Sequence, residues 1–276
     1  MARANKGVSQ GRYYWEAVIQ EGPTADQVKA ALPAQARLGP GLEAQLNSGN
    51  TENQIGHVRL GFSMRTGDLQ APVGYDKWSY GIRDIGGSLI HQSQRQDSWG
   101  GEDFGPGDVV GCGIVFEEDE SHIRFFKNGV GMGQFVLRKG KRTGGEAFFI
   151  EPGTYYPAVS TYLGGSIRAN FGPYFICPPR KLPLGLKGFD PFSDLCARPQ
   201  SPDMAVATLG AAVKQLKSED EAVLLDGLRA ESELLCQSYS DFMQEHIDFV
   251  RKEREERDLP TTDLPEKVHL QENSSS

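Results

Sequence analysis

Short segments in which apolar and polar residues alternate make up most of the first two thirds of the chain. In 57–63, Val58, Leu60 and Phe62 alternate with polar or small residues, which is the two-residue period of a strand with one buried face. Further segments rich in β-branched and aromatic residues are Arg12–Ile19, Trp78–Ile82, Asp108–Phe116, His122–Phe126, Tyr156–Tyr162 and Ser166–Phe171. Many short strands joined by turns favour a mostly β fold, an antiparallel β-sandwich.

Local signals refine this prediction. Asn128 and Gly129 follow the strand at 122–126, and an Asn-Gly pair accepts positive φ at both central positions of a type I′ hairpin turn. Glycines alternate with apolar residues in Asp108–Phe116, which indicates close backbone approach on that face. The weakly apolar stretch 22–56 is predicted to be a long inserted loop with a helical turn near Asp26–Leu32.

The hydrophobic period changes after the sandwich. Cys177–Pro202 holds six prolines, which predicts an extended linker or a surface strap. A helix is expected from about 203 to 217, because apolar residues recur there at helical spacing. Its stripe consists of Val206, Leu209, Val213 and Leu216.

A second helix is predicted to begin at a capping box formed by Ser218 and Glu221 and to continue to Arg257. Its heptad-spaced seam is Leu225, Leu228, Ser232, Leu235, Tyr239, Phe242, His246 and Phe249. The predicted organisation is a sandwich over 1–180, a Pro-rich linker over 181–202, a helical extension over 203–258 and a disordered polar tail over 259–276.

Charge and cysteine usage narrow the class of protein. The net charge of −8 argues against a binder of nucleic-acid phosphates. The charge is uneven, since residues 201–276 hold 17 acidic and 8 basic residues, a net of −9, and residues 1–200 a net of +1. No cysteines have C-x-x-C spacing, so no metal site is expected. An opening without an apolar core and the lack of an apolar run of about 18 residues predict an intracellular chain without a membrane span.

Catalytic motifs are missing from the sequence. No nucleophile elbow, zinc-protease motif or phosphate loop occurs, and the histidines are scattered. We therefore expect no catalytic residue and no cofactor. The acidic run Glu117–Glu120 could be interpreted as the paired carboxylates of a glycoside hydrolase, but it is more typical of a solvated turn at a strand end.

The strongest candidate for binding lies between Arg59 and Arg83. Arginine forks bind carboxylates, and Pro72 and Tyr75 in the intervening loop supply a rigid apolar wall. Such a site suits an acidic peptide with an aromatic or aliphatic anchor. The alternative is that both arginines are ordinary surface residues and Tyr75 is part of the core.

Several sequence blocks together resemble a SPRY domain. These blocks are Gly11–Glu16, Leu60–Ser63, Gly107–Gly111, Phe125–Gly129, Tyr155–Ser160 and Asn170–Gly172. Within SPRY proteins, the stretches Asp68–Tyr80, His91–Ser93 and Asn170–Pro179 resemble the Ash-two / Bre-two family, trithorax-group subunits of COMPASS and MLL-type histone H3 lysine-4 methyltransferase complexes. The resemblance covers about Met1 to Leu195.

This resemblance implies a nuclear, non-catalytic scaffold. In that family the SPRY domain binds an acidic segment of the WD40 subunit through a basic pocket, and the pair stimulates the SET-domain methyltransferase subunit. The pocket residues fall here on Arg59, Pro72, Tyr75 and Arg83. A further basic position of the family pocket falls on Ile85.

The family also carries a C-terminal helix that docks a small dimeric subunit of the Dpy-thirty type. The segment 207–216 resembles that helix, with Leu209, Val213 and Leu216 as the implied anchors. The chain starts without the usual first strand of the domain and without the upstream zinc and DNA-binding modules of many relatives, so neither activity is assigned. The alternatives are a SPRY recognition module of another assembly, such as a ubiquitin ligase, and a jelly-roll enzyme or lectin.

Overall fold

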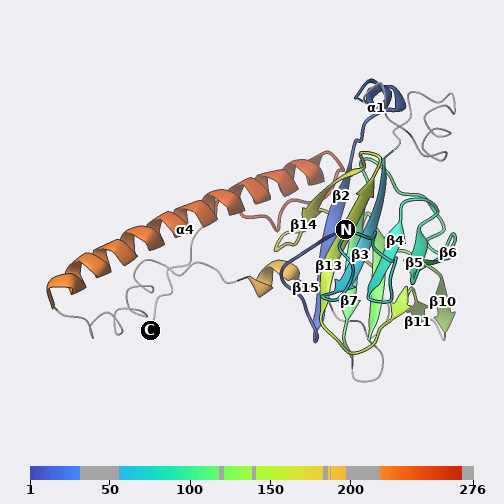
Figure 1. Cartoon of the computed structure of the whole chain (residues 1–276), viewed down its shortest axis with the longest axis horizontal. Coiled ribbons are helices and arrows are strands. Elements are labelled where there is room, and N and C mark those ends of the chain that lie inside the picture. The colour runs from blue at the N-terminus through green and yellow to red at the C-terminus, as the bar shows by residue number, and fades with distance from the viewer. Residues whose placement is uncertain are drawn as a thin grey trace. The chain divides into compact units, whose positions relative to one another are not determined.

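The computed structural model describes residues 1–31, 56–117, 121–138, 141–182, 186, 188–196 and 218–268. The chain divides into two compact units, Met1–Leu195 and Cys196–Ser276. The first unit is built from strands, and the second contains one long helix (Figure 1).

The first unit is a sandwich of two largely antiparallel sheets, which confirms the predicted fold class. One sheet has the order β1-β13-β3-β4-β5-β6. Its strands are β1 (Ala2–Arg3), β3 (His57–Met64), β4 (Ser79–Arg83), β5 (Ser88–His91), β6 (Gln94–Gln96) and β13 (Tyr155–Tyr162). The consecutive strands β13 and β14 belong to different sheets, so the Gly164–Gly165 turn carries the chain from one layer to the other.

The second sheet has the order β12-β8-β7-β2-β14, with β9 pairing β8 and β15 pairing β2. Its strands are β2 (Arg12–Gln20), β7 (Val109–Val115), β8 (His122–Lys127), β9 (Val130–Gly131), β12 (Phe148–Phe149), β14 (Ser166–Asn170) and β15 (Asp190–Pro191). A separate hairpin joins β10 (Phe135–Arg138) to β11 (Lys141–Gly144). The strands predicted at 12–19, 57–63, 108–116 and 122–126 are confirmed to within about a residue.

The core lies between the two sheets. Val58, Leu60 and Phe62 of β3 are buried there, as the alternation predicted, and Trp15, Ala17 and Ile19 of β2 face them from the second sheet. The β8–β9 hairpin turns at Asn128 and Gly129 with φ of 50° and 78°. These values confirm the predicted primed turn, whose twist matches that of the strands.

The outer face of β2 and β7 is also covered, by the chain after β14. Tyr14 packs edge-on against Phe126 and Phe175 and contacts Phe189. A β-carbon at Gly111 would collide with Tyr14, and one at Gly113 with Phe189. The glycine pattern of this strand therefore makes room for aromatic rings as well as for backbone.

A linker was predicted to begin at 181, but β15 and the turn after it belong to the sandwich. The linker prediction is wrong for this part of the segment. β15 pairs in parallel with β2, and Phe192 of the 3₁₀ turn η1 (Phe192–Leu195) is only 3% exposed in the core. The physical reason is that Phe189 and Phe192 carry apolar surface, and burying it packs the segment against the sandwich. Of the alternatives predicted for the proline-rich stretch, the surface strap is the one that this part adopts.

Two further elements concern the ends of the first unit. The short strand β1, which the sequence did not predict, pairs with Val159 and Ala158 of β13. The helix α1 (Ala25–Ala31) confirms the helical turn expected in the insertion, and Thr24 and Gln27 cap it reciprocally. Residues 32–55 of the insertion lie outside the described part.

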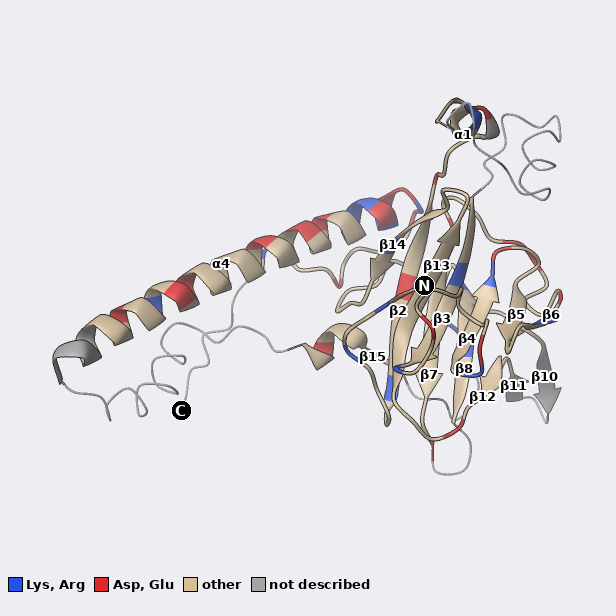
Figure 2. Cartoon of the chain, viewed as in Figure 1, with Lys and Arg blue, Asp and Glu red and all other residues tan. Residues whose placement is uncertain are grey.

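The second unit contains the helix α4 (Ser218–Glu255), with charged residues recurring along it (Figure 2). Its buried face includes Cys236, Met243 and Val250, whereas Leu235 and Phe242 of the predicted seam are more than 60% exposed. In this half, the face that is buried in this chain is therefore offset by one position from the predicted heptad seam. Within the described residues, no helix is both long and apolar enough to cross a membrane.

The prediction of a disordered tail from 259 is also wrong as far as 268. Arg254 is buried, donates to the Pro260 carbonyl and pairs with Asp263, while Leu264 is buried. A single buried guanidinium with several acceptors thus fixes a segment that looks merely polar in the sequence. Residues 269–276 and the predicted docking helix with Leu209, Val213 and Leu216 lie outside the described part.

Candidate functional site

The two predicted arginines lie side by side on the outer face of the first sheet. Arg59 of β3 and Arg83 of β4 are direct register partners, and the next pair on the same face is Gly61 and Gly81. Because the side-chain period of a strand is two, both arginines point away from the core that holds Leu60 and Ile82. Like charges placed directly opposite each other destabilise a sheet, and the Asp84 carboxylate, 3.7 Å from Arg83 Nε, offsets part of this cost.

The structure brings all four predicted site residues to one groove. Arg59, Pro72, Tyr75 and Arg83 line a hollow of about 370 Å³ together with Ile90, Ser93 and Arg95. Tyr75 is 56% exposed, so it forms a wall of this groove and is not a core residue. The alternative interpretation of Tyr75 is thereby excluded.

A second, larger groove of about 660 Å³ adjoins the first and shares Arg59, Pro72 and Arg83 with it. Its other walls include Val58, Ala71 and Ile85, and Thr161 and Tyr162 at the end of β13. Ile85 and Tyr162 are large apolar residues that are 45% and 59% exposed.

The loop that carries Pro72 and Tyr75 is held by the carboxylate of Asp76 and the hydroxyl of Ser79. Asp76 accepts hydrogen bonds from the backbone N–H groups of Asp68 and Trp78 and from the Ser79 hydroxyl. Ser79 Oγ in turn accepts a hydrogen bond from the Gly74 N–H at 3.0 Å. The pKa of Asp76 is lowered overall: burial acts to raise it, but these hydrogen bonds to the ionised form outweigh burial.

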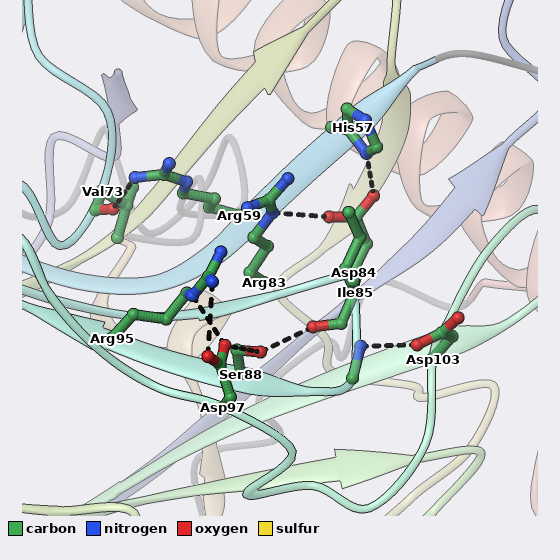
Figure 3. Close-up of polar contacts among 11 residues, drawn as sticks. His57, Arg59, Val73, Arg83, Asp84, Ile85, Ser88, Arg95, Asp97 and Asp103 are labelled. Atoms are coloured by element: carbon green, nitrogen blue, oxygen red, sulfur yellow. Dashed lines mark hydrogen bonds and ion pairs between the residues drawn. The ribbon is translucent and has the colours of Figure 1, made fainter. Parts of the chain in front are cut away.

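The centre of the loop is fixed on the sheet. Val73 is fully buried, and its methyl group fills the space above Gly81 where a β-carbon would sit. Its N–H donates to Ser160 Oγ at 3.1 Å, and its carbonyl accepts from Arg59 Nη1 at 3.3 Å. Gly81 in the sheet therefore admits the loop, and the loop orients Arg59 (Figure 3).

The β5–β6 turn is tied to the same loop. Gln92 and Ser93 have φ of 52° and 60°. Their N–H groups donate to the carbonyls of Asp76 and Gly74, and Ser93 Oγ donates to the Tyr75 carbonyl. This explains why the His91–Ser93 motif accompanies the loop motif: the turn fixes the far wall of the groove and places β6.

The electrostatics of the groove are strongly positive. Burial lowers the pKa of the Arg59 guanidinium, the charges of Arg83 and Arg95 lower it further, and Asp84 acts in the opposite direction. In the described part of the chain, no carboxylate lies within ion-pair distance of Arg59. Because arginine stays protonated in proteins, a bound anion would relieve this repulsion.

The described residues do not gather a set of metal ligands. No group of three His, Cys, Asp or Glu residues there is placed to hold a metal ion. Glu117, the described member of the acidic run, is exposed and lies 3.9 Å from Arg12. The other three residues of that run lie outside the described part.

The sequence did not predict Arg95. It belongs to β6, a three-residue edge strand whose side chains are all exposed, and such a strand has no buried periodicity that would reveal it. The available signal was the position of Arg95 two residues after the His91–Ser93 motif. If Gln92 and Ser93 form a two-residue turn, Gln94 must pair with His91 and Arg95 with Ile90, as the structure shows.

Comparison with known proteins gives the class first. The SPRY domain model matches residues 43–174, and the two-sheet sandwich described above agrees with that assignment. The chain therefore contains a SPRY domain. The sandwich extends beyond the matched range at both ends, to β1 and β2 and to β15.

The relatives then indicate which SPRY proteins the chain resembles. The chain is 25% identical to the Set1 complex component ash2 of Schizosaccharomyces pombe over 63% of the chain, and 27% identical to the Set1/Ash2 histone methyltransferase complex subunit ash-2 of Caenorhabditis elegans over 70%. It is 34% identical to the COMPASS component cclA of Colletotrichum higginsianum over 41%. The chain is therefore similar to subunits of Set1/Ash2 and COMPASS complexes. It spans 32%, 35% and 17% of the lengths of these relatives.

Proposed function

We propose that this chain is a non-catalytic scaffold subunit of a Set1/COMPASS-type histone H3 lysine-4 methyltransferase complex in the nucleus. The names of its relatives support this role, since they are components of Set1 complexes and of COMPASS. The open, arginine-lined groove fits a binding module.

The groove is proposed to bind an acidic segment of the WD40 subunit. The observation that carries this proposal is the convergence of Arg59 and Arg83 with Pro72 and Tyr75 on one exposed groove. Guanidinium forks bind carboxylates through paired hydrogen bonds, and an aromatic wall shields those bonds from water. An acidic ligand would also neutralise the like-charged pair across β3 and β4.

The scaffold role follows from this contact. A WD40 subunit held by the groove would be presented with this chain as one surface to the SET-domain subunit, whose activity the pair would stimulate. By its resemblance to the family helix, the segment 203–217 is proposed to dock a small dimer of the Dpy-thirty type through Leu209, Val213 and Leu216.

Titration calorimetry with a glutamate-rich synthetic peptide tests the groove. Each of Arg59→Ala and Arg83→Ala is expected to weaken binding by about 1.5–3 kcal/mol, the range for a hydrogen bond to a charged group. Arg65→Ala, at an exposed arginine that lines neither groove, is the matched control. Unchanged affinity in the Arg59/Arg83 double variant would reject the groove as the binding site.

The assembly itself is tested by affinity purification from nuclear extract, read by mass spectrometry. Recovery of WD40 and SET-domain subunits, lost in the Arg59/Arg83 double variant, is the expected result. Recovery of a ubiquitin-ligase assembly in their place would contradict the proposed role.

A further inference from the structure

The position of a third arginine extends the proposed groove. Arg95 lines the same hollow as Arg59 and Arg83 but comes from β6, three strands away from β3 in the sheet order. Figure 3 shows the three arginines together, with Arg59 turned toward Val73 and Arg95 held by Asp97. The basic side chain of Arg95 therefore lies at the β6 side of the groove. The apolar side chain of Ile85 lies elsewhere, in the turn after β4.

The geometry of Arg95 leaves it able to bind a ligand. Asp97 engages Nε at 2.6 Å and Nη2 at 3.3 Å, which leaves both hydrogens of Nη1 available. The Ser88 hydroxyl lies 3.3 Å from the same carboxylate and 2.8 Å from the Ile85 carbonyl. Asp97 thus orients the guanidinium, and Arg95 remains 50% exposed.

The opposite side of the site has a different chemistry. The larger groove runs from Tyr162 and Thr161 of β13 across Val58 and Arg59 of β3 to Arg83, with Ile85 and Ala71 as further walls. Its large exposed side chains, Ile85 and Tyr162, are apolar. Exposed large apolar side chains that line one groove beside charged residues offer a contact for an apolar group.

We propose that the two grooves form one binding site with two chemically distinct ends, an acidic-residue subsite at Arg95 and an apolar subsite at Ile85 and Tyr162. This inference rests on the proposed binding of an acidic segment. The strand register sets the direction. Tyr162 pairs with His57, two residues before Arg59, and Ile85 follows Arg83 by two residues. Arg95 pairs with Ile90, in the row of Gly61 and Gly81 on the other side of the two arginines. A peptide along this direction meets the apolar end, then Arg59 and Arg83, and then Arg95.

The ligand is therefore an acidic peptide with an aliphatic or aromatic side chain on one flank only. A purely acidic run would leave the larger groove without an apolar partner, and a nucleic acid would place charged phosphates against Ile85 and Tyr162. Arg95 and Ile85 act as specificity-determining residues: the first selects a carboxylate, and the second selects an apolar side chain.

Fluorescence anisotropy with labelled synthetic peptides tests this arrangement. The probes are a glutamate block with leucines on its N-terminal side, the same block with leucines on its C-terminal side, and the block with serines on both sides. One leucine probe is expected to bind the wild-type chain about tenfold more tightly than the serine probe, the gain from burying an apolar side chain.

The variants separate the two ends. Arg95→Ala should weaken the binding of all three probes about tenfold, because each probe loses a charge-assisted hydrogen bond. Arg65→Ala is the control. Ile85→Ser should remove the preference for leucine and leave the serine probe unchanged, with Val130→Ser, an exposed valine in the other sheet, as control. All four positions are exposed, and circular dichroism checks that the variants are folded.

Each contrary outcome identifies what fails. If Arg95→Ala binds like the control while Arg59→Ala and Arg83→Ala lose affinity, the acidic subsite at Arg95 is wrong and the proposed function stands. If no arginine variant alters binding, both proposals fall. Equal binding of leucine and serine probes, or a preference that survives Ile85→Ser, overturns the apolar subsite. Displacement of the peptide by a single-stranded oligonucleotide as effectively as by unlabelled peptide overturns the assignment to a peptide.

Discussion

At the scale of single residues, the most consequential side chain outside the groove is the carboxylate of Glu16. It is fully buried on β2 and accepts hydrogen bonds from Asn170 Nδ2 and from the N–H groups of Ile176 and Cys177. Burial, and then the nearby charge of Glu16, raise the pKa of Tyr14 well above its usual value. Glu16 thus joins β2 to β14 and to the start of the strap.

Replacing this carboxylate should destabilise the sandwich. Glu16→Ala leaves buried N–H groups without an acceptor, and we expect a loss of about 3 kcal/mol or more in the free energy of unfolding. Urea denaturation followed by tryptophan fluorescence measures it. Glu21→Ala, at an exposed glutamate just after the same strand, is the control and should change stability by less than about 0.5 kcal/mol. Similar midpoints for both variants would contradict the role given to Glu16.

Asp76 gives a second prediction at this scale. Since folding lowers the pKa of Asp76 below its usual value of 3.8, its ionised form stabilises the fold above that value. This contribution is lost as the pH falls through the folded-state pKa. Asp76→Asn should therefore be less stable than wild type at neutral pH, and the two melting curves should converge toward pH 3. Differential scanning fluorimetry over this range measures the difference, and a gap that stays constant with pH would count against it.

At the scale of elements, the end of α4 depends on contacts with the segment that follows it. Arg254 is 5% exposed, and its hydrogen bond lowers the pKa of Asp263. Arg251 Nη2 donates to the Pro265 carbonyl at 2.8 Å, and Gln244 Oε1 accepts from the Val268 N–H at 3.1 Å. The segment 259–268 therefore follows the last turns of the helix back toward Gln244.

Arg254→Ala should release this segment. With the buried guanidinium gone, Asp263 and the Pro260 carbonyl lose their shared donor, and amide hydrogens in 259–268 should exchange much faster. Hydrogen exchange read by mass spectrometry measures this, with Lys252→Ala, at an exposed lysine on the same turn, as control. Protection that persists in Arg254→Ala would mean that other contacts hold the segment.

At the scale of the whole molecule, charge is divided between the parts of the chain. Residues 1–200 are nearly neutral and carry the three-arginine groove, whereas residues 201–276 have a net charge of −9. The total charge of −8 therefore hides a local positive site. Recognition of an acidic partner depends on that local field, which acts over about 10 Å at 0.1 M salt.

Binding of the glutamate-rich peptide should consequently weaken several-fold as NaCl rises from about 0.05 to about 0.5 M. The Arg59/Arg83 double variant should show a shallower dependence, because fewer charged contacts remain to be screened. Calorimetry at several salt concentrations measures both slopes. Equal slopes for wild type and the double variant would contradict an electrostatic groove.

The sequence by itself determined the sandwich, the Asn128-Gly129 turn and the groove residues Arg59, Pro72, Tyr75 and Arg83. These features were predictable because alternation and turn chemistry are local, and because the four pocket positions lie within one loop and its two flanking strands. The resemblance to the Ash2 family added the functional role to positions that local chemistry had already singled out.

Tertiary structure alone decided what depends on contacts distant in sequence. Arg95 joined the groove because β6 is placed by the turn that hydrogen-bonds the 74–76 loop. The strap, the shifted seam of α4 and the ordered segment 259–268 were fixed by Phe192, Met243 and Arg254, each through burial at a site that the local pattern did not specify. A polar or proline-rich sequence reports what the backbone prefers, but only the packed neighbours determine whether its few apolar or charged side chains find a partner.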